Sequence, residues 1–195
     1  MAYELKSARY LAREVLRALI QPGDTAVDAT MGNGYDTEIL CTLTGETGHV
    51  YAFDVQEQAL AETRKRLEAG GLLARAELIR DGHEHMRDHV AGPVQAVVFN
   101  LGWLPGGDHG VTTRWETTRA ALEAALEMIV PGGAAVICAY PGHGEGLREL
   151  LALREFLGAL DNRTFNVLEQ RFLNAGPGAP ECFVIQRNEV RRKKE

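Results

Sequence analysis

The sequence predicts an α/β protein whose central sheet is mostly parallel and carries helices on both faces. Short apolar runs alternate with segments of helical periodicity through most of the chain. Repeated strand–helix units favour parallel strands, because each helix carries the chain back across the sheet. Two apolar runs near the end are separated by a turn rich in Gly and Pro at residues 174–180. They predict an antiparallel pair, so we expect seven strands with an antiparallel last strand.

The first helix is predicted over residues 4–20. Its apolar residues share one face at helical spacing, and they are Leu5, Ala8, Leu11, Ala12, Val15, Leu16 and Leu19. Pro22 and Gly23 follow and end this helix. Charged residues interrupt the apolar ones from position 4 onward, so the segment has no signal-peptide core.

The later elements are placed where apolar runs and helical periodicity are bounded by turn residues. The predicted strands are residues 25–29, 49–53, 75–79, 94–99, 134–140, 165–172 and 182–187. The predicted helices are residues 36–43, 56–69, 114–129 and 145–160, with a short helix after Asp81. A loop rich in Gly and Pro is expected at residues 100–112, and the Pro-Gly-Gly run at residues 131–133 is expected to separate a helix from the next strand.

Length and composition limit the function classes. The 195 residues suit a single domain, which we expect to end in a solubilising basic tail at residues 191–195. The composition of 45% hydrophobic and 25% charged residues is typical of a globular protein. The net charge of −6 provides no global basic field, so any RNA contact must come from local patches. No apolar run reaches membrane-spanning length, so no membrane partner is expected.

Cysteine usage indicates a reducing compartment. Cys41, Cys138 and Cys182 are odd in number, widely spaced and set among apolar residues. We interpret them as buried free thiols in a cytoplasmic protein. His83-x-His85 lacks a third nearby ligand, so no metal site is predicted.

A glycine turn after the first strand predicts a cofactor site. Gly32-x-Gly34 opens the helix that follows, and Asp54 ends the next strand about twenty residues later. Glycines at a helix N-terminus let backbone N–H groups approach an anionic ligand, and a following acidic residue can accept both hydroxyls of a ribose. Thr37 stands where a dinucleotide fingerprint would have its third glycine. An ordinary strand-to-helix turn of any α/β protein is therefore the alternative explanation.

Polar residues follow each of the first five predicted strands. In chain order they include Asp28, Asn33, Asp36, Asp54, Gln56, Asp81, His83, Asn100, Asp108, His109 and His143. Ligands of parallel sheets bind at the carboxyl ends of the strands, so these residues are expected to surround one site.

Nearly the whole chain resembles a class I S-adenosylmethionine-dependent methyltransferase with a Rossmann-like fold. Three runs carry a closer resemblance, namely Asp28-Ala-Thr-Met-Gly-Asn-Gly-Tyr-Asp36, Asn100-Leu-Gly-Trp-Leu-Pro-Gly-Gly-Asp108 and Tyr140-Pro-Gly-His143. They are similar to a bacterial subfamily long labelled rRNA methylase. That subfamily methylates the aminomethyl group of 5-aminomethyl-2-thiouridine at the tRNA wobble position. Trp103 departs from the pattern, which has Tyr there.

The resemblance implies roles for the residues of the cofactor side. The backbone of residues 32–34 (Gly32, Asn33, Gly34) would hold the methionine part of S-adenosylmethionine, with Asp28 and Asp36 near its ammonium group. Asp54 would take the ribose hydroxyls, with Gln56 nearby. Asp81 would face the adenine amino group, and Gly82 and His83 would flank the ring. The product would be S-adenosylhomocysteine.

The resemblance places the acceptor side of the pocket at Asn100. The loop that begins there, expected at residues 100–112 and called the acceptor loop, resembles the Asn-Pro-Pro-aromatic loop of methyltransferases that modify amino groups. An amide oxygen and a backbone carbonyl can both accept hydrogen bonds from one amine, which directs its lone pair toward the methyl group. Trp103 could stack on the target base. The alternatives are a turn residue that caps the strand end for Asn100 and an aromatic packed under the loop for Trp103.

A protonated alkylamine must lose a proton before it attacks. Asp108, His109 and His143 are candidate proton acceptors, and each could instead cap a loop or contact the substrate. Alternatively, the amine could lose its proton in solvent before it binds.

His85 and His89 are interpreted as solvated or structural.

The expected partner is a tRNA anticodon loop, whose wobble base is single-stranded and can be splayed out. Arg114 and Arg119 follow the acceptor loop and are the preferred phosphate contacts, whereas residues 64–66 (Arg-Lys-Arg) are interpreted as a solvated helix face. A homodimer could extend the surface.

Ribosomal RNA or a small molecule is an alternative acceptor. An NAD-dependent oxidoreductase and a non-catalytic nucleotide-binding protein are alternatives from other classes, because the fold alone excludes neither.

Overall fold

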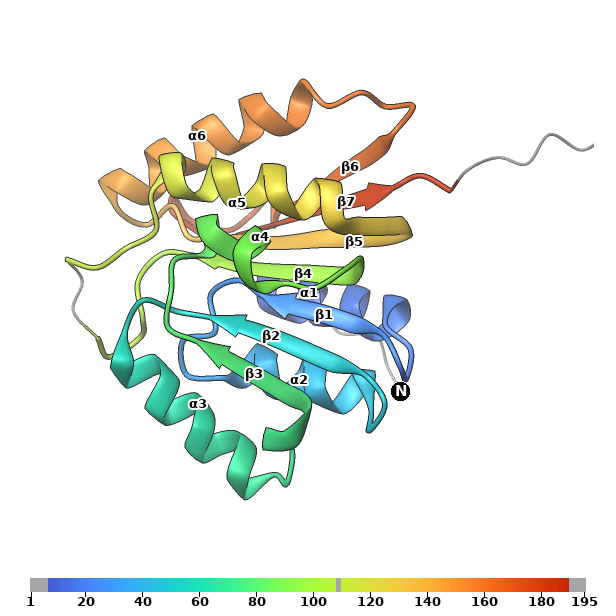
Figure 1. The fold of residues 1–195 in the computed structure, drawn as a ribbon. Helices are drawn as coiled ribbons and strands as arrows, with labels where there is room; N and C mark the ends of the chain where they lie inside the picture. The colour runs from blue at the N-terminus through green and yellow to red at the C-terminus, as the bar shows by residue number, and fades with distance from the viewer. Residues whose placement is uncertain (1–6, 108–109, 190–195) are drawn as a thin grey trace, which may run out of the picture.

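The computed structural model describes residues 7–107 and 110–189, and these residues form a seven-stranded sheet in the order β3-β2-β1-β4-β5-β7-β6 (Figure 1). The strands are β1 (Thr25–Asp28), β2 (His49–Phe53), β3 (Ala76–Ile79), β4 (Val94–Leu101), β5 (Ile129–Ala139), β6 (Phe165–Gln170) and β7 (Glu181–Arg187). The first five strands pair in parallel. The order reverses between β1 and β4, and this reversal places a ligand crevice at their carboxyl ends.

The predicted antiparallel pair at the end of the chain is confirmed. Strand β7 lies between β5 and β6 and runs antiparallel to both. The fold class expected from the sequence, a mostly parallel sheet with an antiparallel last strand, is the one observed.

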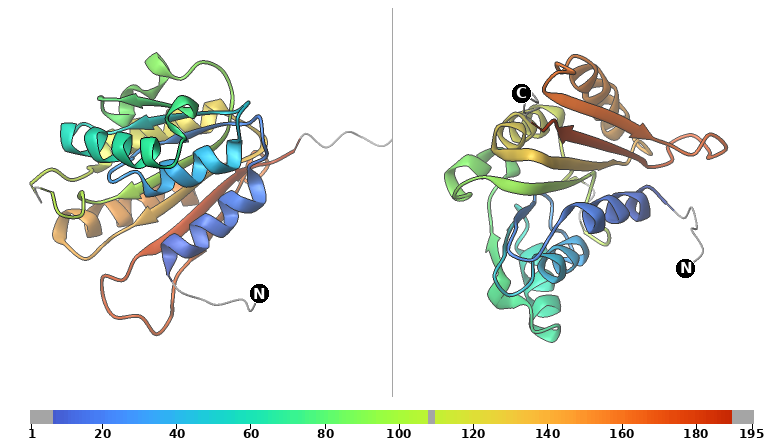
Figure 2. Two further views of the ribbon diagram at one scale, coloured as in Figure 1. Left: turned by 90° about the horizontal axis from the view of Figure 1, so that it is seen from below. Right: turned by 90° about the vertical axis from the view of Figure 1, so that its right-hand side faces the viewer.

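Helices cover both faces of this sheet (Figure 2). The first face carries α1 (Ala8–Leu19), α2 (Tyr35–Thr44) and α3 (Glu57–Ala69), and the second carries α4 (Met86–His89), α5 (Trp115–Met128) and α6 (Gly144–Gly158). Short 3-10 turns lie at Leu73–Arg75 and His83–His85. None of the helices within residues 7–107 and 110–189 is both long and apolar enough to cross a bilayer.

The core is divided into two layers by the alternation of side chains along the central strands. In β4, Ala96 and Val98 pack against α1 and α2, whereas Val97 and Phe99 pack against α5. Consecutive side chains of a strand point to opposite faces, so a strand buried on both sides reads as a continuous apolar run.

The first helix starts later than predicted. It begins at Ala8, because Ser7 is extended and its hydroxyl accepts a hydrogen bond from the backbone N–H of Tyr10. Ser is a favoured N-cap residue, since its oxygen satisfies a free N–H of the first turn. The expected start at residue 4 is therefore wrong, and residues 1–6 lie outside the described residues.

Strands β4 and β5 are both longer than predicted. The Pro-Gly-Gly run at residues 131–133 lies inside β5 and does not precede it, because the register between β4 and β5 shifts there. Val94 is paired with Ile129 while Ala96 is paired with Ala134, so the extra residues of β5 form a bulge. At the other end, β4 continues to Leu101 and includes Asn100, which we expected in a loop.

The α5 side of the core should be sensitive to lost volume. Leu122 of α5 is completely buried, so Leu122→Ala should lower the free energy of unfolding by about 2–5 kcal/mol. Leu151 of α6 is 56% exposed and provides the control, because Leu151→Ala should change stability by less than about 0.5 kcal/mol. Urea unfolding of both variants checks this, and equal losses would contradict the assignment of the core.

Candidate functional site

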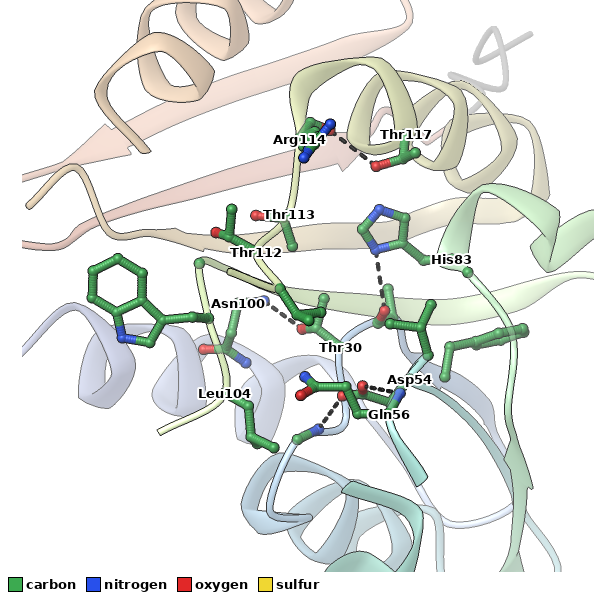
Figure 3. A pocket seen from close by; sticks show the side chains of 18 of the residues that line it. Thr30, Asp54, Gln56, His83, Asn100, Leu104, Thr112, Thr113, Arg114 and Thr117 are labelled. Carbon is green, nitrogen blue, oxygen red and sulfur yellow. Dashed lines mark hydrogen bonds between the residues drawn. The ribbon is translucent and has the colours of Figure 1, made fainter. Parts of the chain in front are cut away.

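A cavity of about 270 Å³ lies at the carboxyl edge of the sheet, where the strand order reverses (Figure 3). Its wall comes from the ends of β1, β2 and β4, from the segment after β3, and from residues 111–114 and 117 around the start of α5. The volume is close to the lower end of the range for small-molecule sites. The cavity therefore lies where the sequence predicted a site.

The turn between β1 and α2 requires glycine at two positions. Gly32 has φ +51° and Gly34 has φ +76°, both in the left-handed region that side chains disfavour. A Cβ on Gly34 would also come within 2.9 Å of the Cα of Thr63 in α3. The hydroxyl of Thr63 donates a hydrogen bond to the Gly32 carbonyl at 3.0 Å. The turn is thus held tightly against α3, and a side chain on Gly34 would separate them.

Asp54 joins this turn to the end of β2. Its carboxylate accepts hydrogen bonds from the backbone N–H of Gly32 at 3.0 Å and of Gln56 at 3.0 Å. Burial raises the pKa of Asp54, and these hydrogen bonds partly counteract that rise. A carboxylate has about four acceptor positions, so Asp54 can still accept hydrogen bonds from a ligand. Gly32, Asp54 and Gln56 all line the cavity, as the sequence predicted.

The residues after β3 form a second part of the wall. The Asp81 carboxylate accepts hydrogen bonds from His85 at 2.7 Å, His89 at 2.9 Å and the Gly82 N–H at 2.7 Å, and these lower its pKa to about 2. His85 and His89 therefore hold Asp81 in place and are not simply solvated. Asp81 and Gly82 line the cavity.

His83 lines the cavity as a buried, neutral ring. Its Nδ1 lies 3.2 Å from the carbonyl of Ala29, which can only accept, so Nδ1 carries the proton. Burial lowers the pKa of His83, which keeps the ring neutral near pH 7. A neutral, flat ring at this position suits contact with an aromatic base.

The structure corrects the expected position of Asp28. This side chain is fully buried and does not line the cavity. It accepts hydrogen bonds from the Thr37 hydroxyl at 2.7 Å and the Thr30 N–H at 3.2 Å, so it supports the turn from below. Burial raises its pKa to about 7, and the nearby Asp36 adds to the rise.

Asn33, Gly34 and Asp36 are also not part of the cavity wall. The Asn33 amide donates to the Pro105 carbonyl at 3.3 Å, which links the glycine turn to the acceptor loop. Asp36 is only 8% exposed and is bound to Arg13 and Asn100. Both carboxylate oxygens of Asp36 are thus bound by protein groups, and its contact with a cofactor ammonium group stays a prediction.

Asn100 is held on three sides at the acceptor side of the cavity. Its backbone N–H donates to the Thr30 hydroxyl at 2.7 Å, and its side-chain amide donates to Asp36 at 2.9 Å. The Tyr140 hydroxyl lies 3.5 Å from its Oδ1, and burial raises the pKa of Tyr140, so this hydroxyl stays protonated and donates. The second lone pair of Oδ1 remains available to a ligand.

Trp103 and His143 form an aromatic pair at the acceptor loop. The ring centroids are 4.1 Å apart and the planes are tilted by 35°. Trp103 lines the cavity and His143 does not. His143 caps α6, because its Nδ1 accepts from the Gly146 N–H at 3.2 Å. That nitrogen is therefore engaged and cannot act as the expected proton acceptor.

Two predicted residues fall outside the described part of the chain. Asp108 and His109 belong to the acceptor loop but are not among residues 7–107 and 110–189.

The two arginines predicted to contact phosphate, Arg114 and Arg119, differ in their surroundings. Arg114 lines the cavity and its guanidinium has no carboxylate partner among the described residues, whereas Arg119 is paired with Glu123 at 2.9 Å. Arg114 is thus the better placed of the two for a phosphate.

Sequence reasoning missed the residues that hold the end of the acceptor loop. Glu149 of α6 is buried and accepts hydrogen bonds from Thr113 at 2.7 Å and Thr118 at 2.6 Å. Burial raises the pKa of Glu149, and the two hydroxyls counteract that rise. Thr113 and Thr117 also line the cavity. A glutamate on the apolar face of a helix was the available signal, since such a residue is rarely buried without partners.

Within residues 7–107 and 110–189, no group of three or more His, Cys, Asp or Glu side chains is arranged to hold a metal ion.

Gly34→Ala should cost more stability than a left-handed glycine elsewhere. Ala in the left-handed region costs roughly 1–2 kcal/mol, and at Gly34 the contact with Thr63 adds to this. Gly71 is the matched control, because its φ is +66° and nothing lies within 4 Å of its missing Cβ. Denaturant unfolding should show a clearly larger loss for Gly34→Ala. Equal losses would mean that α3 does not press on the turn.

Asp28 should make stability fall as the pH rises. A carboxyl whose pKa is raised on folding contributes fully below the unfolded value of 3.8, and this contribution is lost as the pH rises toward about 7. Asp28→Asn cannot ionise, so its stability relative to the parent chain should be greater at pH 8 than at pH 5. Urea unfolding at both pH values measures this, and a difference that does not change with pH would contradict the burial of an ionisable Asp28.

Comparison with known proteins agrees with this geometry. A family model described as Putative rRNA methylase matches residues 50–186. A chloroplastic tRNA (mnm(5)s(2)U34)-methyltransferase of Arabidopsis thaliana is 37% identical over 93% of this chain and 70% of its own length.

Two solved structures are similar over nearly their whole length. One is a putative rRNA-methylase from Clostridium thermocellum, with 40% identity, a TM-score of 0.93 and coverage of 95% of this chain and 100% of that one. The other is a putative methyltransferase from Streptococcus mutans in complex with SAH, with 36% identity, a TM-score of 0.86 and coverage of 94% and 99%. The chain therefore belongs to the family described as Putative rRNA methylase and is an S-adenosylmethionine-dependent methyltransferase.

Proposed function

We propose that this enzyme methylates an amino nitrogen, namely the aminomethyl group of 5-aminomethyl-2-thiouridine at the wobble position of tRNA. The observation that carries the proposal is the orientation of Asn100, a residue of the cavity wall whose amide nitrogen is bound to Asp36, which leaves its amide oxygen as the end that can accept a hydrogen bond. An oxygen in this position accepts a hydrogen bond from an amine. The name of the Arabidopsis relative, a tRNA (mnm(5)s(2)U34)-methyltransferase, supports the choice of amine.

The residues around the cavity fit the cofactor. Asp54 has acceptor positions left for the two ribose hydroxyls, and Gln56 lies beside it. Asp81, Gly82 and the neutral ring of His83 would contact the adenine. The backbone at Gly32 would hold the methionine part, because no Cβ keeps a ligand away from it. When bound, the cofactor supplies a methyl group on a positively charged sulfur.

The chain's own part in the reaction is to position the acceptor. Asn100 would fix the amine so that its lone pair faces the methyl group, and Trp103 would stack on the target base. Holding both reactants in a near-attack pose can supply about 7–11 kcal/mol of the barrier reduction at best. Asp108 and His109 remain the candidate proton acceptors, because Nδ1 of His143 is engaged in capping α6.

The surroundings of the cavity support an RNA acceptor. Arg114 lies at its wall with an exposed side chain that no described carboxylate neutralises, so it could contact a phosphate of the anticodon loop. Such a contact is local, in keeping with the net charge of −6. We also infer a cytoplasmic enzyme, because Cys41, Cys138 and Cys182 are all buried free thiols.

Transfer of labelled methyl groups to tRNA tests the proposal. The enzyme is incubated with labelled S-adenosylmethionine and tRNA from cells that lack the wobble-uridine methylation, and nucleoside mass spectrometry locates the methyl group. We expect it on the aminomethyl nitrogen of the wobble uridine. Transfer to ribosomal RNA or to small amines alone would contradict the substrate while leaving the reaction class intact.

The two sides of the cavity should respond differently to mutation. Asp54→Ala removes a charged acceptor, worth about 1.5–3 kcal/mol, so the Kd of S-adenosylmethionine should rise roughly ten- to a hundredfold. Asn100→Ala should leave that Kd within about threefold and lower kcat by about a hundredfold, because the amine is no longer oriented. Calorimetry and single-turnover kinetics measure the two effects. Equal losses of cofactor affinity would contradict this division of roles.

A further inference from the structure

An interior chain of polar contacts runs from α1 to the acceptor side of the cavity. It joins Arg13 of α1, Asp36 of α2, Asn100 of β4 and Tyr140 after β5. Asp36 is only 8% exposed, and the other three are half-buried. Burying a carboxylate at this depth lowers the stability of the fold unless its charge is paired and its oxygens accept hydrogen bonds. The contacts with Arg13 and Asn100 meet both requirements.

The two oxygens of Asp36 have different partners. Oδ1 accepts a hydrogen bond from Nε of Arg13 at 2.9 Å and lies 2.9 Å from Nη2 of the same side chain. Oδ2 accepts from Nδ2 of Asn100, also at 2.9 Å. Arg13 thus neutralises the carboxylate through one oxygen and leaves the other to Asn100.

This division of partners decides which end of the Asn100 amide faces Asp36. An amide presents donors at one end and acceptors at the other, and Oδ2 of Asp36 can only accept. The nitrogen end must therefore face Asp36, and the oxygen end faces away from it. Tyr140 reinforces the same orientation, because its hydroxyl donates toward Oδ1 from 3.5 Å. That contact is long, so it leaves Oδ1 free to accept from a substrate.

We propose that Arg13 and Asp36 are positioning residues that lock the Asn100 amide with its oxygen presented to the acceptor amine. They act through Asn100 and contact neither the cofactor nor the substrate. The proposal rests on the proposed function, since it assumes that the acceptor carries N–H groups. It also explains why Asp36, an acidic residue next to the glycine turn, is not part of the cavity wall.

Asp36→Asn tests the lock with almost no change of shape. Arg13 would take the single oxygen of the new amide, so the NH₂ group at position 36 would face Asn100. Asn100 would then turn over and present its own NH₂ group to the amine. We expect kcat to fall about a hundredfold while the Kd of S-adenosylmethionine changes less than about threefold.

An exchange of the two side chains provides the rescue. In the double variant Asp36→Asn with Asn100→Asp, the carboxylate at position 100 accepts from the amide at position 36 and presents its second oxygen to the amine. We expect kcat at least tenfold above that of Asp36→Asn alone. Asn100→Asp alone places two carboxylates in contact and should lose activity. Glu14→Gln, which disrupts only an exposed ion pair on the same helix, is the control and should leave both constants unchanged.

The outcomes separate the lock from the other roles of Asp36. A large rise in cofactor Kd with kcat unchanged would overturn the proposal, because it would make Asp36 a ligand of the ammonium group. Failure of the exchanged pair to recover activity would also overturn it.

A measurement on the unmodified chain without substrate tests the lock even if a variant does not fold or the enzyme does not methylate tRNA. In NMR spectra of the unmodified chain, the Asn100 side-chain amide protons should exchange slowly, with one of them shifted downfield by the carboxylate. Rapid exchange without such a shift would overturn the proposal independently of the substrate assignment.

Discussion

The left-handed turn between β1 and α2 is the constraint on which the site depends. Gly32 and Gly34 allow the chain to turn so sharply that the Gly32 N–H reaches Asp54 at the end of β2. Thr63 and Arg66 of α3 donate to the carbonyls of the same turn at 3.0 Å and 2.8 Å. One turn therefore fixes the relative positions of two strands and a helix, and with them the cofactor side of the cavity.

The acceptor side is built onto the same turn. The Thr30 hydroxyl, at the entry to the turn, accepts from the backbone of Asn100 at 2.7 Å, and Asp36, just beyond the turn, holds the Asn100 side chain. The pairing of Asn100 with Cys138 of β5 fixes its position along the carboxyl edge of the sheet. Donor and acceptor sides are thus parts of one rigid unit, which suits a reaction whose rate depends on the alignment of two groups.

Much of the fold could be predicted from the sequence, because its determinants are local. Alternating runs and helical periodicity located each strand and helix, and the glycine spacing located the turn. The errors fell where a distant partner decides the outcome. The bulge at residues 131–133 depends on the register with β4, and Asn100 belongs to a strand because β5 continues beside it. The same holds for the site: position in the chain could not show that Asp28 and Asp36 face inward, or that Glu149 holds Thr113.

The most direct test of this account is a crystal structure of the chain with S-adenosylhomocysteine bound. The account predicts that both ribose hydroxyls lie within hydrogen-bond distance of the Asp54 carboxylate and that the sulfur faces Asn100, with the Asn100 amide nitrogen still on Asp36. A ligand whose ribose lies away from Asp54, or whose ammonium group displaces Asn100 from Asp36, would contradict it.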